Sequence, residues 1–206
     1  FYPWDSIDLV LFTCFAYGII KSFSKRFFIL IFIIGILNRE SALFLPIYLM
    51  LDSFNFSKER FSFHLTKPKS LIIGIGILFS GIAYTKIIRH LLFVSKVNGL
   101  PDVKNELLGN HINLFWNIKQ LFFYNFTNNN FYVSLFIILS FGYFLINLRR
   151  MDDRILKLLI VSLFIILNII TFGLVNETRM HFILLPFFSF LWLCLNQKNF
   201  NSKKEY

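Results

Sequence analysis

A short polar cluster, Asn38-Arg39-Glu40, interrupts a long apolar stretch of this 206-residue chain, between the runs Phe27–Leu37 and Ala42–Leu51. Arginine suits phosphate, because its planar guanidinium forms paired hydrogen bonds with an oxyanion and keeps its charge. A neighbouring carboxylate can accept a proton, hold a metal ion or accept hydrogen bonds from sugar hydroxyls. We therefore expect Asn38, Arg39 and Glu40 to contribute to a substrate- or phosphate-binding site.

A second polar cluster, Asn176–His181, follows an apolar run near the end of the chain. It contains Glu177 and Arg179, so both clusters combine an arginine with a carboxylate. We expect Glu177 and Arg179 to bind substrate or phosphate together with the first cluster. A structural alternative stays open, in which Arg39 only forms a neutralising ion pair, with Glu40 or with the second cluster.

Asp5 and Glu40 are the candidates for a catalytic carboxylate, and neither is assigned that role. Asp5 stands at the start of an apolar run, where it could equally complement the dipole of a helix. The two cysteines, Cys14 and Cys194, lie within apolar runs and lack the spacing of a zinc or redox motif. The sequence therefore indicates no protein metal site, while the use of a divalent metal ion stays open.

The composition is typical of a membrane protein. Hydrophobic residues make up 56% of the chain and aromatic residues 19%, and the mean hydropathy is +0.64. Soluble domains average about 45–50% apolar residues. The formal charge of +10 does not indicate nucleic acid, because Lys and Arg cluster in short segments between apolar runs. There they act as topology signals and face anionic lipid.

The alternation of apolar and basic segments predicts an all-α integral membrane protein with about seven transmembrane helices in one domain, residues 1–206. The positive-inside rule places the N-terminus outside and the C-terminus in the cytoplasm. This topology puts 14 of the 21 Lys and Arg residues on the inner side. The predicted spans are Trp4–Ile20, Phe27–Leu37, Ser41–Leu51, Ser70–Ile88, Phe131–Leu148, Ile155–Phe172 and Phe182–Leu195.

The second and third spans are shorter than the about 20 residues that a crossing needs. They could form one tilted helix with Asn38-Arg39-Glu40 at its centre, or a hairpin of two short helices. Basic residues precede and follow the pair, so both outer ends are predicted to be cytoplasmic, which favours the hairpin. The polar cluster then lies at an external tip, on the same side as Asp5 and Asn176–His181.

Two segments between the spans are polar. Asp52–Pro68 is predicted to be a basic cytoplasmic loop with an interfacial stretch at Phe54–Phe63. Residues 91–130 are predicted to form an external loop. Within it, Leu114–Phe126 mixes aromatic residues with Asn, Lys and Gln, as in a helix that lies in the membrane interface. We expect this loop to help cover an acceptor or a carrier lipid.

The run Phe28–Met50, which contains ILIFIIGILNRESALFLPIYLM, resembles the short-helix pair of GT-C-type membrane glycosyltransferases. Its Gly35, Arg39, Ala42 and Pro46 occupy the glycine, basic, alanine and proline positions of that pattern. The opening Tyr2-Pro3-Trp4-Asp5 and the closing Glu177-x-Arg179 followed by Leu185-Pro186 also resemble bacterial members. The likeness extends over most of the chain as a pattern, and the Asn-Arg-Glu segment is its most specific part.

This resemblance implies a multi-pass enzyme of the bacterial cytoplasmic membrane that takes sugars from polyprenyl-phosphate carriers at the external face. The usual catalytic acid residue of such enzymes lies in a loop after the first helix, which we expect upstream of Phe1. In this interpretation Arg39 and Arg179 hold the lipid-linked phosphate, while Glu40 and Glu177 orient the sugar or the arginines. A transporter or flippase for a lipid-linked or anionic solute, and a structural membrane subunit, stay open as alternatives.

Overall fold

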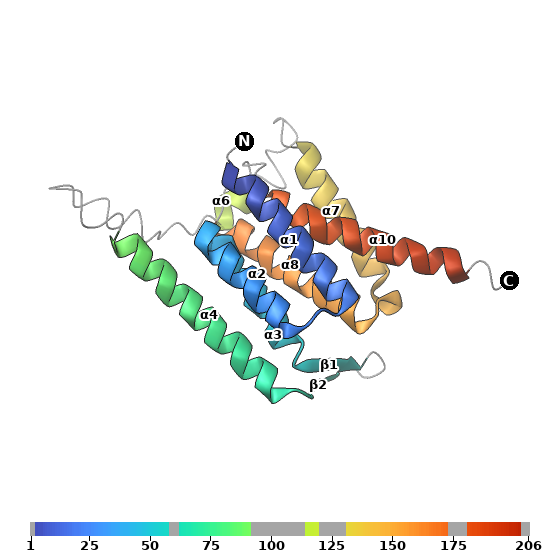
Figure 1. Ribbon diagram of the computed structural model, residues 1–206. Coiled ribbons are helices and arrows are strands. Elements are labelled where there is room, and N and C mark those ends of the chain that lie inside the picture. The colour runs from blue at the N-terminus through green and yellow to red at the C-terminus, as the bar shows by residue number, and fades with distance from the viewer. Residues whose placement is uncertain (1–2, 58–61, 92–113, 120–130, 173–180, 203–206) are drawn as a thin grey trace.

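The computed structural model describes residues 3–57, 62–91, 114–119, 131–172 and 181–202. They are mostly helical, and the helices pack side by side in a bundle (Figure 1). The predicted all-α class is confirmed, with a small β-hairpin added. The elements are α1 Pro3–Lys21, α2 Lys25–Asn38, the 3-10 helix η1 Glu40–Phe44, α3 Leu45–Leu51, β1 Phe54–Ser57, β2 Ser62–Leu65, α4 Pro68–Arg89, α6 Leu114–Lys119, α7 Phe131–Ile146, η5 Leu148–Arg150, α8 Asp153–Phe172, η6 Phe182–Leu184 and α10 Leu185–Ser202.

Two helices of the described residues are long and apolar enough to cross a membrane, Pro68–Ile88 in α4 and Asp153–Thr171 in α8. These two helices do not support the seven crossings and the topology predicted from the sequence. Three other apolar helical segments among the described residues are shorter, at 10–17 residues. These segments are Glu40–Leu51, Leu135–Ile146 and Phe182–Gln197.

A tight turn makes α1 and α2 antiparallel. Ser22 takes the left-handed conformation, with φ 56°. The amide of Phe23 donates to the Gly18 carbonyl at 2.9 Å, and the amide of Ser22 donates to the Ile19 carbonyl at 3.2 Å. This pair of hydrogen bonds is the Schellman pattern, which satisfies the last carbonyls of a helix and reverses the chain.

The helix α2 and the segment η1–α3 form the hairpin that the charge pattern predicts. At its tip Arg39 has extended backbone, with φ −162° and ψ 153°, so α2 ends there. The rings of Phe28 and Tyr48, far from the tip, have centroids 4.7 Å apart. Nearer the tip, a Cβ atom on Gly35 would lie 2.9 Å from the Cβ of Ala42. These contacts pair residues at equal distances from the tip, so the two arms run antiparallel.

The segment Asp52–Pro68, predicted to be a basic cytoplasmic loop with an interfacial stretch, contains the antiparallel hairpin β1–β2, which the sequence analysis did not predict. Its place at the membrane interface stays a prediction. In its register Phe56 pairs with Phe63. Apolar and polar residues alternate along both strands, which is the period of a half-buried strand. The amide of Phe56 donates to Asp153 Oδ1 at 3.4 Å, so the hairpin is attached to the start of α8. In Figure 1 it lies at the end of the bundle opposite α6.

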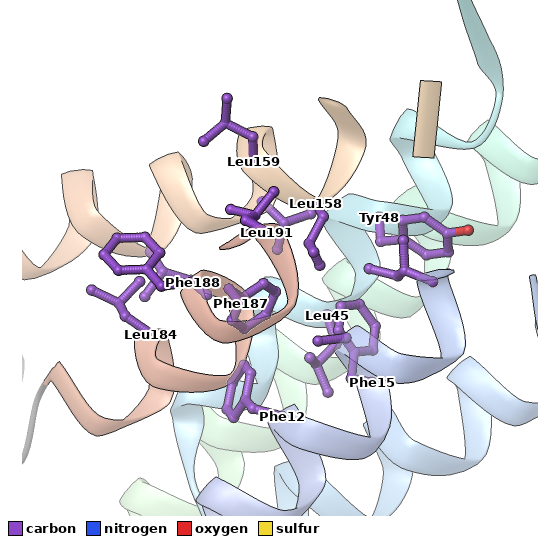
Figure 2. Close-up of a cluster of buried hydrophobic side chains, with 14 of the residues drawn as sticks. Phe12, Phe15, Leu45, Tyr48, Leu158, Leu159, Leu184, Phe187, Phe188 and Leu191 are labelled. Carbon is purple, nitrogen blue, oxygen red and sulfur yellow. The ribbon is translucent and has the colours of Figure 1, made fainter. Parts of the chain in front are cut away.

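The hydrophobic core lies where α1, α3, α8 and α10 meet (Figure 2). The ring of Phe187 has its centroid 6.0 Å from that of Phe12 and 6.3 Å from that of Phe15. Phe15 also meets the ring of Tyr48 at 5.8 Å. Because α1 is central to this core, the polar groups near its N-terminal end are held in a fixed position.

In contrast, α4 lies at the edge of the bundle (Figure 1) and packs mainly on α3 and η1. Two glycines allow the close approach: a Cβ on Gly74 would lie 2.6 Å from Met50 Cγ, and one on Gly81 would lie 2.8 Å from Leu43 Cδ2. The C-terminal part of α4 thereby comes next to the hairpin tip. Ile72 and Phe79 are exposed, which fits a helix that borders lipid.

Candidate functional site

The N-terminal part of α1 carries two buried carboxylates. Asp5 is 6% exposed and Asp8 is 2% exposed. Residues three apart in an α-helix lie on the same face, so both side chains point in one direction. Aspartate is almost never this buried unless it is paired. The pairing groups come from the tip of the α2–η1 hairpin.

The hairpin tip neutralises and orients these aspartates. Arg39 Nη1 lies 2.9 Å from Asp5 Oδ1 and 3.9 Å from Asp8 Oδ2. Asn38 Nδ2 donates to Asp8 Oδ1 at 2.7 Å, and Ser41 Oγ donates to Asp8 Oδ2 at 2.8 Å. Both oxygens of Asp8 therefore accept hydrogen bonds, and the tip is joined to α1 by three side chains. The extended backbone at Arg39 is what turns Asn38 and Ser41 toward the same carboxylate.

A cavity of about 600 Å³ lies beside this network. Its volume is within the range of about 300–1,000 Å³ that small-molecule sites occupy. Both polar and apolar side chains line it, so it suits an amphipathic ligand. The polar residues of the wall are Asp8, Asn38, Arg39, Glu40, Ser41, Tyr84, Thr85 and Asn168, and the apolar ones are Ile36, Leu37, Leu43, Phe44, Ile88, Ile169 and Ile183.

The short helix α6 is anchored to the end of α8, where Ile169 lines the cavity. Asn117, which is 0% exposed, donates from Nδ2 to the Ile170 carbonyl at 2.8 Å and to the Ile169 carbonyl at 3.4 Å. These carbonyls belong to the last turn of α8, where a helix has no partners of its own for them. Phe115 on α6 is 80% exposed. Of the predicted interfacial helix Leu114–Phe126, residues Leu114–Lys119 form α6, and the remaining residues lie outside the described part of the chain. Its place at a membrane interface stays a prediction.

A second ionic cluster occupies the opposite end of the bundle. The Nζ of Lys157, a residue only 4% exposed, lies 2.6 Å from Asp153 Oδ2 and 4.0 Å from Asp52 Oδ1. Lys67 Nζ lies 3.3 Å from Asp52 Oδ1. Lys157 Nζ also lies 5.9 Å from the centroid of the Phe56 ring. Each charge of this cluster meets an opposite charge, and the cluster joins α3, α4, α8 and β1. We call the end of the bundle that carries Arg39 and the tip of the α2–η1 hairpin the cavity end. We call the opposite end, which carries Lys157 and the β1–β2 hairpin, the hairpin end.

The structure places the predicted site residues as follows. Asn38, Arg39 and Glu40 all line the cavity. Asp5 does not line it, and instead forms the ion pair with Arg39 that the structural alternative assigned to other partners. Glu177 and Arg179 lie outside the described residues, so their predicted meeting with the first cluster stays a prediction.

Five polar lining residues were missed by the sequence analysis: Asp8, Ser41, Tyr84, Thr85 and Asn168. Asp8 could have been found, because its spacing of three from Asp5 puts two carboxylates on one helical face of an apolar run. Tyr84 and Thr85 carry no such signal, since only the packing of α4 against η1 brings them to the tip.

Within the described residues, no group of three or more His, Cys, Asp or Glu side chains is placed to hold a metal ion. Comparison of the chain with models of protein families, with curated proteins and with solved structures found no match. The functional argument therefore rests on the cavity and the residues around it.

Proposed function

We propose that this chain belongs to a multi-pass membrane glycosyltransferase of the GT-C kind, and that its cavity binds a sugar linked to polyprenyl phosphate. The observation that carries the proposal is the mixed lining of the cavity, which combines carboxylate, amide and hydroxyl groups with Ile, Leu and Phe side chains. A soluble sugar needs no apolar wall of this extent, whereas a lipid-linked one does. The cavity also lies directly at the segment that resembles the GT-C short-helix pair.

The residues that carry the resemblance to the GT-C short-helix pair have physical roles in the α2–η1–α3 hairpin. Gly35 allows the two arms of the hairpin to touch at Ala42, as the 2.9 Å approach shows. Pro46 stands in the first turn of α3, where its missing amide costs nothing. Arg39 ends α2 and meets α1. The pattern therefore builds the tip that borders the cavity, which supports the proposal.

The charge distribution supports a membrane orientation with the cavity end outside. Contacts between helix ends gather Lys21, Lys25 and Arg154 at the hairpin end: Lys25 Nζ donates to Ser70 Oγ, and Arg154 Nη1 donates to the Ile20 carbonyl at 3.2 Å. Basic residues favour the cytoplasmic side. In the proposed arrangement the shorter helices complete about seven crossings, the N-terminus lies outside, and the protein resides in the bacterial cytoplasmic membrane.

The proposed reaction transfers one glycosyl group. An acceptor hydroxyl oxygen forms a bond to the anomeric carbon as the bond from that carbon to the phosphate oxygen breaks. The bonding electrons leave with polyprenyl phosphate, and the acceptor proton passes to a base. Asp8 is poorly suited to be that base, because both its oxygens already accept hydrogen bonds. Glu40 is the other described carboxylate that lines the cavity, and a base outside the described residues is equally compatible with the proposal.

The direct test is sugar transfer from polyprenyl-phosphate hexose by the purified protein in a detergent without a sugar headgroup. We expect Glu40→Gln to lower transfer at least tenfold while the thermal unfolding midpoint stays unchanged. Arg26→Gln is the matched control, because Arg26 is exposed near the opposite end of the same hairpin arm. Full activity after replacement of Glu40, and also after the neutral pair Asp5→Asn with Arg39→Gln, would exclude a substrate site at the tip.

One observation favours a second function, a transporter or flippase. The α2 helix is broken at Arg39 beside a cavity, and broken helices with charged residues are common at transport sites. Reconstituted vesicles separate the two functions: movement of polyprenyl-phosphate hexose between leaflets without any sugar transfer would replace the enzyme with a transporter.

A further inference from the structure

The helix α8 carries an asparagine, Asn168, one turn before its C-terminal end and within an apolar segment. An amide in such surroundings costs free energy unless it forms hydrogen bonds, and in membrane proteins it commonly bonds to a neighbouring helix. Two other asparagines of the bundle do so. Asn117 on α6 donates to the Ile170 carbonyl of α8 at 2.8 Å, and Asn196 on α10 accepts from the Tyr143 hydroxyl of α7 at 3.1 Å.

Asn168 differs from both, because its amide makes no hydrogen bond with any residue that the structure describes and instead lines the cavity. The side chain is half-buried, beside Ile169, which is 4% exposed and lines the same cavity. Its nitrogen and oxygen are not among the fully buried side-chain atoms of the described residues that lack a hydrogen-bond partner. A ligand in the cavity can therefore reach the amide.

Two hydroxyl groups from a different helix, those of Tyr84 and Thr85 on α4, line the same cavity. Thr85 Oγ1 donates to the Ile82 carbonyl at 2.9 Å, so its oxygen remains able to accept a hydrogen bond. An amide both donates and accepts hydrogen bonds, as the hydroxyl groups of a sugar do, whereas the charged oxygens of a phosphate only accept. The amide of Asn168 therefore matches a sugar hydroxyl better than it matches phosphate.

We propose that Asn168 is a specificity-determining residue, whose amide forms hydrogen bonds with one hydroxyl group of the bound sugar and so selects a fully hydroxylated hexose over a deoxyhexose. The physical reason is that an analogue without this hydroxyl leaves the amide unpaired in the complex. The inference rests on the proposed function and narrows its substrate class. It concerns the sugar alone and holds for either position of the phosphate, inside or outside the cavity.

The test measures binding to the purified full chain by calorimetry, in a detergent without a sugar headgroup. The parent probe is whichever of polyprenyl-phosphate glucose, galactose and mannose the unaltered protein binds most tightly. The other probes are the analogues of this parent that lack a single hydroxyl group, and polyprenyl phosphate without sugar. The informative variant is Asn168→Leu, which removes the amide and keeps a side chain of similar size. Asn196→Leu is the matched control, because Asn196 follows an apolar run of α10 but bonds to Tyr143 and does not line the cavity.

We expect the unaltered protein to bind the parent about fivefold more tightly than one of the deoxy analogues, the effect of one hydrogen bond. Asn168→Leu should weaken binding of the parent about fivefold. Its affinities for that analogue and for polyprenyl phosphate should stay within about twofold of those of the unaltered protein, because the interaction is already absent there. The midpoint of thermal unfolding should not fall, and Asn196→Leu should change none of these affinities.

Three results would overturn the assignment of Asn168 to a sugar hydroxyl: an equal loss for the parent and every analogue, no loss for any probe, or a lower unfolding midpoint of Asn168→Leu. In each of these cases, binding of the parent by the unaltered protein would still support the proposed function. If the unaltered protein binds none of the hexose conjugates, the proposed function fails and this inference fails with it.

Discussion

The two ends of the bundle carry ionic clusters of similar chemistry in different surroundings. At the cavity end, Arg39 meets Asp5 and Asp8, whose side chains are 5% and 2% exposed, beside a cavity of about 600 Å³. At the hairpin end, Lys157 is the buried member, and its partners Asp52 and Asp153 are 19% and 38% exposed. One cluster thus buries two acids under a partly accessible cation, and the other buries a cation under accessible acids.

This difference indicates which of the two clusters has only a structural role. The hairpin-end cluster joins β1, α3, α4 and α8, and its charges compensate one another. The cavity-end cluster borders space for a ligand. A role in stability is expected at both ends, whereas a role in ligand binding is expected only at the cavity end.

The largest effect should come from removing the cation at the cavity end. Arg39→Met leaves two buried carboxylates without their cation, and breaking a buried pair in this way costs about 3–5 kcal/mol. Because Arg39 itself is 29% exposed, we expect a loss at the lower limit of this range. The free energy of unfolding, measured with denaturant in mixed micelles, should fall by about 3 kcal/mol. The added change Asp5→Asn should restore part of the loss. A loss below about 1 kcal/mol would mean that water reaches the aspartates and weakens the pair.

The next effect tests the hairpin that carries the cavity-end cluster. In Gly35→Ala the new Cβ would lie 2.9 Å from the Ala42 Cβ, so the arms must separate, at a cost of about 1–3 kcal/mol. Gly142→Ala is the control: a Cβ there meets nothing within 4 Å, and replacing a mid-helix glycine should stabilise α7 by about 0.5–1 kcal/mol. We therefore expect the two substitutions to change the free energy of unfolding, measured with denaturant, in opposite directions. Stabilisation by Gly35→Ala would contradict the close contact of the arms.

A smaller effect is expected from the corresponding change at the hairpin end. Lys157→Met keeps most of the length of the buried side chain. Because its partners Asp52 and Asp153 are partly solvated, we expect the free energy of unfolding to fall by only about 1 kcal/mol. Asp52 retains Lys67, and Asp153 retains the amide of Phe56. The same unfolding measurement applies, and binding of polyprenyl-phosphate hexose should not change. Loss of ligand binding in this variant would remove the distinction between the two ends.

How far the sequence predicts this molecule depends on whether a feature is local. The bounds of α7 and α8 can be predicted approximately from the bounds of the apolar runs. The hairpin at Arg39 can be predicted from the basic residues that precede and follow the two apolar runs. The β-hairpin was missed because Phe54–Phe63 is rich in aromatic and basic residues, which is also the composition of an interfacial segment. Its alternating pattern was the better guide.

The candidate site was predicted only in part for a different reason. Asn38, Arg39 and Glu40 can be recognised in the sequence because placing polar residues between membrane-spanning apolar runs costs free energy. The partner of Arg39 could not be chosen, because Asp5 lies 34 residues away and several acids compete for the role. Thr85 and Tyr84 look like ordinary residues of an apolar helix, and only the register of α4 against η1, set by Gly74 and Gly81, brings them to the cavity.

The smallest effect should be local and confined to the cavity end. Asn117→Leu removes the amide that serves the Ile169 and Ile170 carbonyls, and a lost hydrogen bond of this kind is worth about 1 kcal/mol. Because α6 has only six residues, the change should free α6 without unfolding the bundle, and its amides should exchange hydrogen about fivefold faster. Exchange in α3 and at the hairpin end should not change. If exchange rises equally in both regions, the two ends are one cooperative unit, and the separate role of the cavity end must be argued from ligand binding alone.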